Sequence, residues 1–220
     1  MILNILVFLG SVRISSPPAP ARLGQRVTLC CAQQLRAADH NVTVIDPLDY
    51  DLGASFKPYF SYKAETAPER LQQLSELIKT ANAYVMVSPE YNHSMSPALA
   101  NLLNHFGSSL FSYKPSTIVT YSAGQWGGVR TAVNMRSFLS ELGCLPVSAM
   151  IHLPKAQEIL NAEGGYLTSV NANDWQAYFE RSFNQLIWWA SAAKGYQTQG
   201  HFQPDAFTRT PAQRNAPAAD

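Results

Sequence analysis

Apolar residues along this chain form short continuous runs that alternate with longer amphipathic stretches. The runs Ile2–Leu9, Ala83–Ser88 and Thr117–Ser122 are nearly uninterrupted, as is typical of parallel strands covered on both faces. Two further runs, Val42–Asp46 and Val147–Leu153, also predict strands. The pattern therefore indicates five strands separated by helices.

The amphipathic stretches predict helices over Leu23–Arg36, Pro68–Ala81, Pro97–Phe106, Gly128–Leu142 and Trp175–Ala193. Strands that alternate with helices of this length indicate βαβ units and a parallel sheet. Right-handed crossovers leave few arrangements of such units. We predict an α/β, flavodoxin-like three-layer sandwich with a five-stranded parallel sheet in the order 2-1-3-4-5.

The length of 220 residues fits one domain, which we expect over residues 1–197. Residues 198–220 contain several prolines and predict an extended or disordered tail. Residues 47–67 have no clear period and many aromatic residues, so we expect a surface excursion there.

Composition and charge narrow the classes of partner. Apolar residues make up 46% of the chain, charged residues 14%, and the formal net charge is +1. This balance fits a large core and argues against nucleic-acid binding. The apolar start is too short to span a membrane and lacks a positive flank, so we expect no membrane association. Three cysteines and five histidines show no metal-ligand spacing, which favours a reduced cytoplasmic protein without a metal site.

The loop after the first strand contains groups that bind phosphate. Gly10–Pro18 offers a glycine, three hydroxyls, backbone amides and one arginine directly before a helix. Such donors near a helix start make a monophosphate site. A serine-rich turn with a solvated arginine is the alternative. The spacing matches neither GxxxxGK nor GxGxxG.

Two more polar loops follow the third and fourth strands. Pro89–Pro97 carries a proline, an aromatic ring, a carboxylate, an amide and two hydroxyls, a set that suits a planar, heteroatom-rich ligand better than a metal ion. Tyr121–Arg130 has three glycines within five residues, which lets backbone amides approach a ligand, although a flexible hinge is the alternative. Strands 1, 3 and 4 are neighbours in the predicted order, so the three loops meet at one edge. This combination suits a flavin mononucleotide.

Three motifs carry a family resemblance: Gly10-Ser11-Val12-Arg13, Pro89-Glu90-Tyr91-Asn92-His93-Ser94 and Ser122-Ala123-Gly124-Gln125-Trp126-Gly127-Gly128. With them the chain closely resembles the NADPH-dependent FMN reductase family of flavodoxin-like proteins, which includes quinone, azo-dye and chromate reductases. The similarity covers roughly residues 1–190, and its elements occur in order.

The resemblance implies non-covalently bound FMN and specific ligands for it. Ser11, Arg13 and Ser16 would hold the phosphate. Prolines at positions 17, 18 and 20 remove amide donors, so part of this cradle is expected to shift to Arg22, Gly24 or Gln25. The flavin ring would be lined or contacted at its edge by Pro89, Glu90, Tyr91, Asn92, His93, Ser94, Ser122, Ala123, Gly124, Gln125, Gly127 and Gly128.

The function that the resemblance implies is hydride transfer from NADPH or NADH through FMN to a quinone-like or other small aromatic acceptor. Neighbouring subunits commonly complete such sites in the family, so we expect a homodimer or homotetramer. Flavin chemistry needs no catalytic side chain; His93 is a candidate proton donor or an ordinary loop residue. Glu90 is assigned a structural or subunit-contact role, and Arg130 either attracts a nicotinamide phosphate or caps its own loop. The alternative is a flavin-binding regulator of a protein partner.

Overall fold

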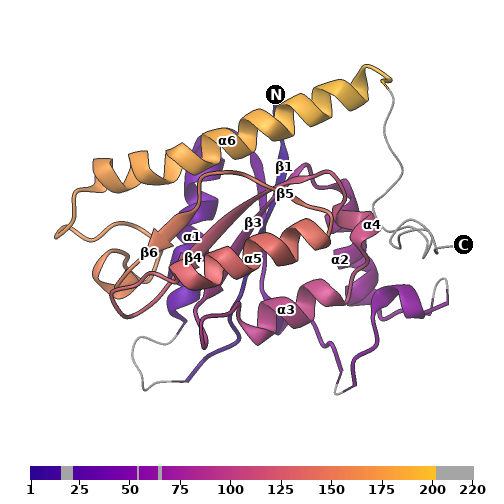
Figure 1. The fold of residues 1–220 in the computed structure, drawn as a ribbon, viewed down its shortest axis with the longest axis horizontal. Helices are drawn as coiled ribbons and strands as arrows, with labels where there is room; N and C mark the ends of the chain where they lie inside the picture. Colours follow the sequence, from indigo (N-terminus) through magenta and orange to yellow (C-terminus); the bar gives the residue numbers. More distant parts are fainter. Residues whose placement is uncertain (16–21, 54, 64–65, 202–220) are drawn as a thin grey trace, which may run out of the picture.

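The protein forms a parallel β-sheet between two layers of helices. A computed structural model describes residues 1–15, 22–53, 55–63 and 66–201. The sheet runs in the predicted order β2-β1-β3-β4-β5, with a sixth strand also bonded to β4 (Figure 1). The strands are β1 (Asn4–Leu9), β2 (Asn41–Ile45), β3 (Ala83–Pro89), β4 (Pro115–Tyr121), β5 (Leu145–Pro146) and β6 (Ile151–Leu153).

The helices divide between the two faces of the sheet. They are α1 (Leu23–Ala37), α2 (Glu69–Thr80), α3 (Pro97–Asn104), α4 (Ser108–Phe111), α5 (Val129–Glu141) and α6 (Ala172–Thr198). One buried cluster joins the sheet to α1 and α6, and the other joins it to α2, α3, α4 and α5. This arrangement is the predicted three-layer sandwich.

Strand β1 supplies side chains to both layers. Ile5 and Val7 belong to the cluster beneath α1 and α6, whereas Leu6 and Phe8 belong to the opposite one. Successive side chains of a strand point to opposite faces, and here both faces are covered. A largely apolar run is therefore the sequence signature of this strand and of β3. In β4 every residue is also buried, but Ser116, Thr117 and Thr120 interrupt the apolar run.

The predicted fifth strand is wrong in one respect, because the structure has two short strands, β5 and β6, in place of a single one. Both pair in parallel with β4. Between them, Ala149 bonds to helix α6: its N–H donates to the Gln185 side chain, and its carbonyl accepts from Ser182. Arg136 donates to the carbonyls of Val147 and Ser148. These side-chain bonds replace the ladder over the interruption.

Other segments differ from the prediction in extent. Helix α6 begins earlier than expected because Asn171 caps it, accepting from the N–H groups of Asn173 and Asp174. It continues to Thr198, and residues 202–220 of the predicted tail lie outside the described residues. In the 47–67 excursion, the Tyr59 N–H donates to the His105 carbonyl at 2.7 Å. Within the described part of the chain, every helix is too short or too polar to cross a membrane.

Candidate functional site

The loops after β1, β3 and β4 lie at one edge of the sheet. These three strands are direct neighbours, with Val7 beside Val85 and Val85 beside Thr117. All run in the same direction, so their carboxyl ends meet at the lower edge in Figure 1. Ligands of open α/β sheets bind at such edges. The structure thus brings the three predicted loops together.

The first loop lies directly against strand β3. A Cβ added at Gly10 would meet the Val87 carbonyl oxygen at 2.2 Å, so only glycine fits there. The next residue, Ser11, is buried, and its Oγ accepts a 3.3 Å hydrogen bond from the Arg13 N–H. The Arg13 guanidinium donates to the Ser15 carbonyl at 3.2 Å. Ser16, the third predicted phosphate ligand, lies outside the described residues.

Helix α1 begins beside this loop at Arg22, whose backbone is left-handed with φ 56°. Its guanidinium forms an ion pair with Asp46 and donates to the Ser11 carbonyl. The Arg22 charge is therefore paired with a carboxylate at the end of β2. Gly24 in the first turn lies under the Tyr121 hydroxyl, which a Cβ would meet at 2.2 Å. Burial raises the pKa of Tyr121, so this phenol stays neutral.

The second loop folds into a tight turn. Tyr91 and Ser94 exchange two backbone hydrogen bonds, of 3.1 and 2.9 Å. Between them, Asn92 and His93 have φ values of 51° and 62°, the left-handed pair typical of a type I′ turn. The turn leaves Tyr91 42% exposed, at the rim of the site.

Helix α5 holds this turn in place through two contacts that sequence reasoning missed. Thr131 donates to the Ser94 carbonyl at 3.0 Å, and Asn134 donates to the His93 carbonyl at 2.6 Å. The partners are 37 and 41 residues apart, so no local pattern reveals them.

A charged cluster links the second loop to the third. Glu90 Oε1 lies 2.6 Å from His93 Nδ1 and 3.9 Å from an Arg130 nitrogen, and the Glu90 side chain is only 13% exposed. The Arg130 guanidinium lies over the Trp126 ring, 5.4 Å from its centroid. The Glu90 carboxylate therefore lies between His93 of the second loop and Arg130 at the end of the third.

Ser96 fixes the distance between the first two loops. Its buried hydroxyl donates to the Gly10 carbonyl and accepts from the Leu99 N–H at 3.1 Å, which caps helix α3. Its own N–H donates to Ser88 Oγ at 3.0 Å.

Substituting Ser96 by alanine should lower the free energy of unfolding by ~1–3 kcal/mol, because a helix cap is lost and the buried Gly10 carbonyl loses its donor. Urea denaturation measures this value. Ser109→Ala in the short helix α4 is the matched control. An unfolding free energy unchanged in Ser96→Ala would contradict the assigned anchor.

The third loop is a glycine-rich turn organised by Ser122. Ser122 Oγ accepts from the Gly127 N–H at 2.9 Å and donates to the Gly124 carbonyl at 2.8 Å. Gly127 and Gly128 have φ values of 60° and 79°. The segment after β6 also holds the turn, because the Lys155 N–H donates to the Gly124 carbonyl at 2.8 Å. The Ala123 carbonyl accepts from the Gln157 side chain, and Gln125 lies next to Trp126 in the same turn.

A hollow of about 690 Å³ opens between the first two loops and the start of α3. This volume is typical of small-molecule and cofactor sites. It is lined by Ser11, Val12, Arg13, Glu90, Tyr91, Asn92, Ser96, Pro97 and Ala98. Five predicted ligands are among these residues, whereas no residue of the third loop is among those that line the hollow.

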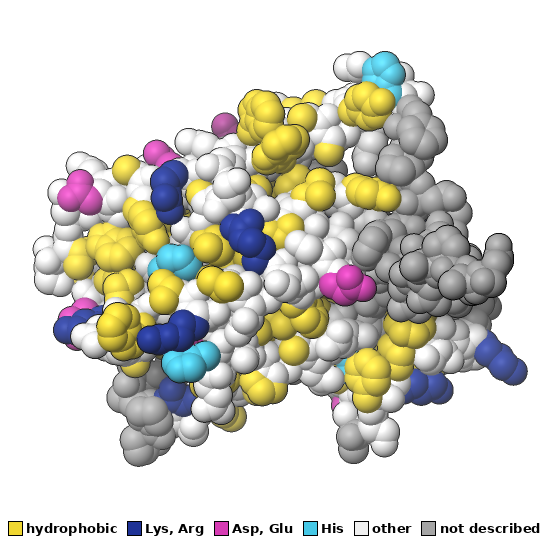
Figure 2. All heavy atoms as spheres, viewed as in Figure 1, with side chains coloured by type: hydrophobic (Ala, Val, Ile, Leu, Met, Phe, Trp, Pro, Cys, Tyr) yellow, Lys and Arg dark blue, Asp and Glu magenta, His cyan; other side chains and the backbone are white. Residues whose placement is uncertain are grey.

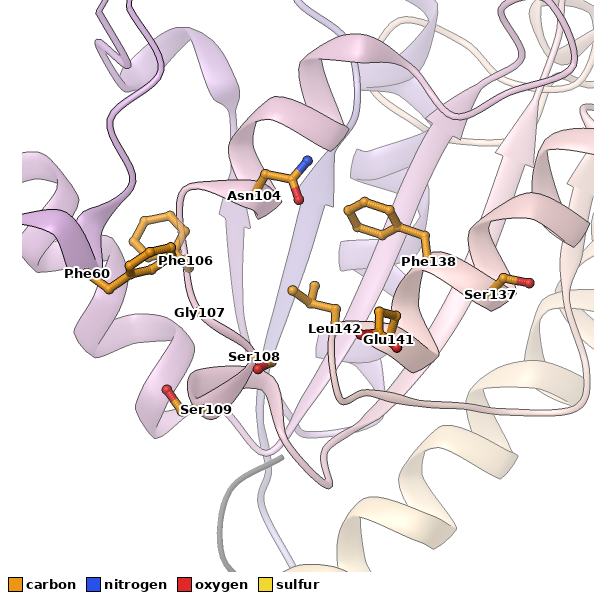
Figure 3. Close-up of a pocket in the computed structure, with 10 residues that line it drawn as sticks. All are labelled: Phe60, Asn104, Phe106, Gly107, Ser108, Ser109, Ser137, Phe138, Glu141 and Leu142. Carbon is orange, nitrogen blue, oxygen red and sulfur yellow. The ribbon is translucent and has the colours of Figure 1, made fainter. Parts of the chain in front are cut away.

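A larger hollow of about 880 Å³ lies elsewhere, between the end of α3, α4 and the end of α5. Figure 3 shows Asn104 on one side and Phe138 and Leu142 on the other, with Phe60 and Phe106 further along. Glu141 is the one lining residue with a formal charge. Serines 108, 109 and 137 line this hollow, but its lining includes no guanidinium and no glycine-rich turn like those at the strand edge.

The described residues contain no group of three or more His, Cys, Asp or Glu side chains that could hold a metal ion. All three cysteines are unpaired and buried. Burial raises the pKa of each thiol, that of Cys144 to about 12. The thiols are therefore protonated at neutral pH, which makes them poor nucleophiles.

Comparison with known proteins identifies the class. The sequence pattern of the NADPH-dependent FMN reductase family matches residues 3–158. A Bacillus NADPH azoreductase is 33% identical over 92 residues, 41% of this chain and 52% of that protein. An Escherichia coli quinone reductase is 35% identical over 78 residues, 34% of this chain and 42% of that protein. The chain spans about half the length of these relatives.

A solved structure agrees on the fold. FerB, a flavoenzyme NAD(P)H:(acceptor) oxidoreductase from Paracoccus denitrificans, superimposes with a TM-score of 0.64 at 17% identity, covering 84% of this chain and 97% of that one. The chain belongs to the NADPH-dependent FMN reductase family. The predicted family is confirmed, and the family's description names the predicted flavin, FMN.

Proposed function

We propose that the three loops at the strand edge bind FMN. Ser11 and Arg13 hold the phosphate near the N-terminus of α1, the end of a helix that favours an anion. The observation that carries this proposal is the 690 Å³ hollow between the first two loops, with the third loop following the neighbouring strand β4 at the same edge of the sheet. Ser16, outside the described residues, remains a proposed third ligand.

The chemistry of the donors fits a flavin. The Arg13 guanidinium and the Ser11 hydroxyl suit a phosphate dianion. The second loop, from Pro89 to Ser94, offers a partly exposed aromatic ring and backbone donors beside the hollow. The third loop, from Ser122 to Gly128, follows the adjacent strand β4, and its glycines allow backbone amides to approach a ring edge closely.

We propose that the chain is an NAD(P)H-dependent oxidoreductase that reduces a quinone-like or other small aromatic acceptor. Bound FMN supplies the hydride-accepting and hydride-donating chemistry. The protein orients both substrates over one pocket, and no side chain is required as an acid or base. His93, exposed and bonded to Glu90, is proposed as a rim residue. The names of the relatives, an azoreductase and a quinone reductase, support this acceptor class.

A flavin-binding regulator is the competing function, and anaerobic stopped flow separates the two. The FMN-loaded protein is mixed with NADPH, and separately with NADH, while the flavin absorbance near 450 nm is followed. Loss of the absorbance within seconds, and its return on adding a quinone, is the expected result. Flavin that stays oxidised for minutes under both nicotinamides would favour the regulator.

The free thiols support a reducing cytoplasm as the compartment.

We propose further that the chain forms a homodimer or homotetramer. Trp188 and Trp189 on α6 are 63% and 50% exposed, and Figure 2 shows hydrophobic side chains gathered at the surface over the middle of this helix. Exposed apolar patches of this kind mark interaction sites.

Replacing both tryptophans by serine should reduce the oligomer to a monomer, because the contact loses its largest apolar groups. Light scattering after size exclusion measures the mass of each form. Replacing the exposed Phe56 by serine provides the control and should leave the mass unchanged. A wild-type monomer at all tested concentrations would contradict the proposal.

A further inference from the structure

A hydrogen-bonded chain of side chains supports the glycine-rich loop from within the sheet. Thr120 on β4 is fully buried, and its Oγ1 lies 2.8 Å from the Gly127 carbonyl oxygen and 2.8 Å from His152 Nδ1. A carbonyl only accepts, and a hydroxyl has one proton to give. Satisfying both contacts therefore requires that His152 Nδ1–H donates to Thr120 and that Thr120 donates to Gly127.

The position of His152 is set by strand β6. His152 is the register partner of Thr120 in the pairing of β6 with β4. The backbone N–H of His152 donates to the Tyr178 hydroxyl of α6 at 3.0 Å, which fixes the backbone at this position. Burial and the nearby Arg181 charge lower the pKa of His152. The imidazole is thus neutral at physiological pH, and its single N–H is on the nitrogen facing Thr120.

The chain of bonds determines where the next amide points. In a planar trans peptide, C=O and N–H point in opposite directions. With its carbonyl directed at Thr120, the Gly127–Gly128 peptide aims the Gly128 N–H away from β4. The two consecutive glycines have positive φ. Because glycine has no Cβ, steric contacts within the loop do little to fix the orientation of this peptide. Within the described parts of the chain, no residue accepts a hydrogen bond from this N–H.

We propose that His152 is a positioning residue for the cofactor: acting through Thr120, it holds the Gly127–Gly128 peptide so that the Gly128 N–H donates to the flavin ring edge. The inference rests on the proposed function, since it requires FMN in the three-loop site. A donor aimed at the pyrimidine edge favours the reduced, anionic ring over the oxidised one. The relay therefore tunes the flavin potential as well as its affinity.

The test is a double-mutant cycle on FMN binding. His152→Phe keeps a planar ring without a donor, Thr120→Val keeps the shape without the hydroxyl, and Thr120→Ser restores the hydroxyl. We expect His152→Phe and Thr120→Val each to weaken FMN binding ~3–10-fold, the range for one lost hydrogen bond. Because both act on one peptide, the double variant should bind no more weakly than Thr120→Val alone. Thr120→Ser should bind like the wild type.

The midpoint potential of bound FMN, measured by dye equilibration, should fall in His152→Phe and in Thr120→Val. In Thr120→Ser it should equal the wild-type value. A merely structural histidine would leave this potential unchanged. Additive effects in the double variant would overturn the proposed role of His152, and so would wild-type affinity and potential in His152→Phe. In either case, FMN binding by the wild-type protein would still support the proposed function. A wild-type protein that fails to bind FMN would overturn both.

Discussion

Gly10→Ala is expected to destabilise the fold by ~2–4 kcal/mol and to abolish FMN binding, the largest effect of any single methyl group in the site. The new Cβ would lie 2.2 Å from the Val87 carbonyl oxygen. That oxygen belongs to the backbone of β3, so relief requires β1 or β3 to move. Either movement separates the first loop from the second. Urea denaturation and FMN fluorescence quenching measure the two consequences.

Gly195→Ala is the control for this substitution. Gly195 lies in helix α6 with nothing within 4 Å of an added Cβ, so alanine should stabilise the protein slightly, by ~0.5–1 kcal/mol. FMN affinity should not change. A Gly10→Ala protein as stable as the wild type would contradict the close contact between the two strands.

Arg13→Ala should weaken FMN binding ~10–150-fold and leave riboflavin binding unchanged. The magnitude is that of a charge-assisted hydrogen bond, ~1.5–3 kcal/mol. Riboflavin lacks the phosphate, so it reports the ring contacts alone. Fluorescence titrations with both flavins provide the comparison.

Arg36→Ala offers a matched loss of charge far from the loops, at the end of α1, where Arg36 donates to the Val42 carbonyl. Its FMN affinity should equal that of the wild type. An equal loss for FMN and riboflavin in Arg13→Ala would mean that Arg13 acts on the ring or the fold, and would refute its assignment to the phosphate.

The layers and strand order could be predicted because the sequence carries them locally. Buried parallel strands appear as largely apolar runs, and Leu71, Leu74 and Ile78 mark one helix face. The split of the fifth strand could not be predicted. It depends on Ser182 and Gln185, which lie on a helix more than thirty residues away and take over the hydrogen bonds of Ala149.

The site was predictable to the level of its loops. Each loop has its own local composition, and the strand order brings them together. The bonds between the loops were hidden, because Ser96 reaches Gly10 across 86 residues and Thr131 reaches Ser94 across 37. The pairing of Arg22 with Asp46 also joins residues that are distant in the sequence, 24 positions apart. Such contacts follow from packing of the finished fold and leave no pattern in the neighbouring residues.

The three-loop FMN site is tested most directly by mapping FMN binding through amide chemical shifts. Spectra of ¹⁵N-labelled protein are recorded as FMN is added to one equivalent. We predict that the largest shifts fall in three separate segments, residues 10–13, 89–96 and 122–128. Shifts centred instead on the larger hollow in Figure 3, around Phe106, Phe138 and Leu142, would contradict it.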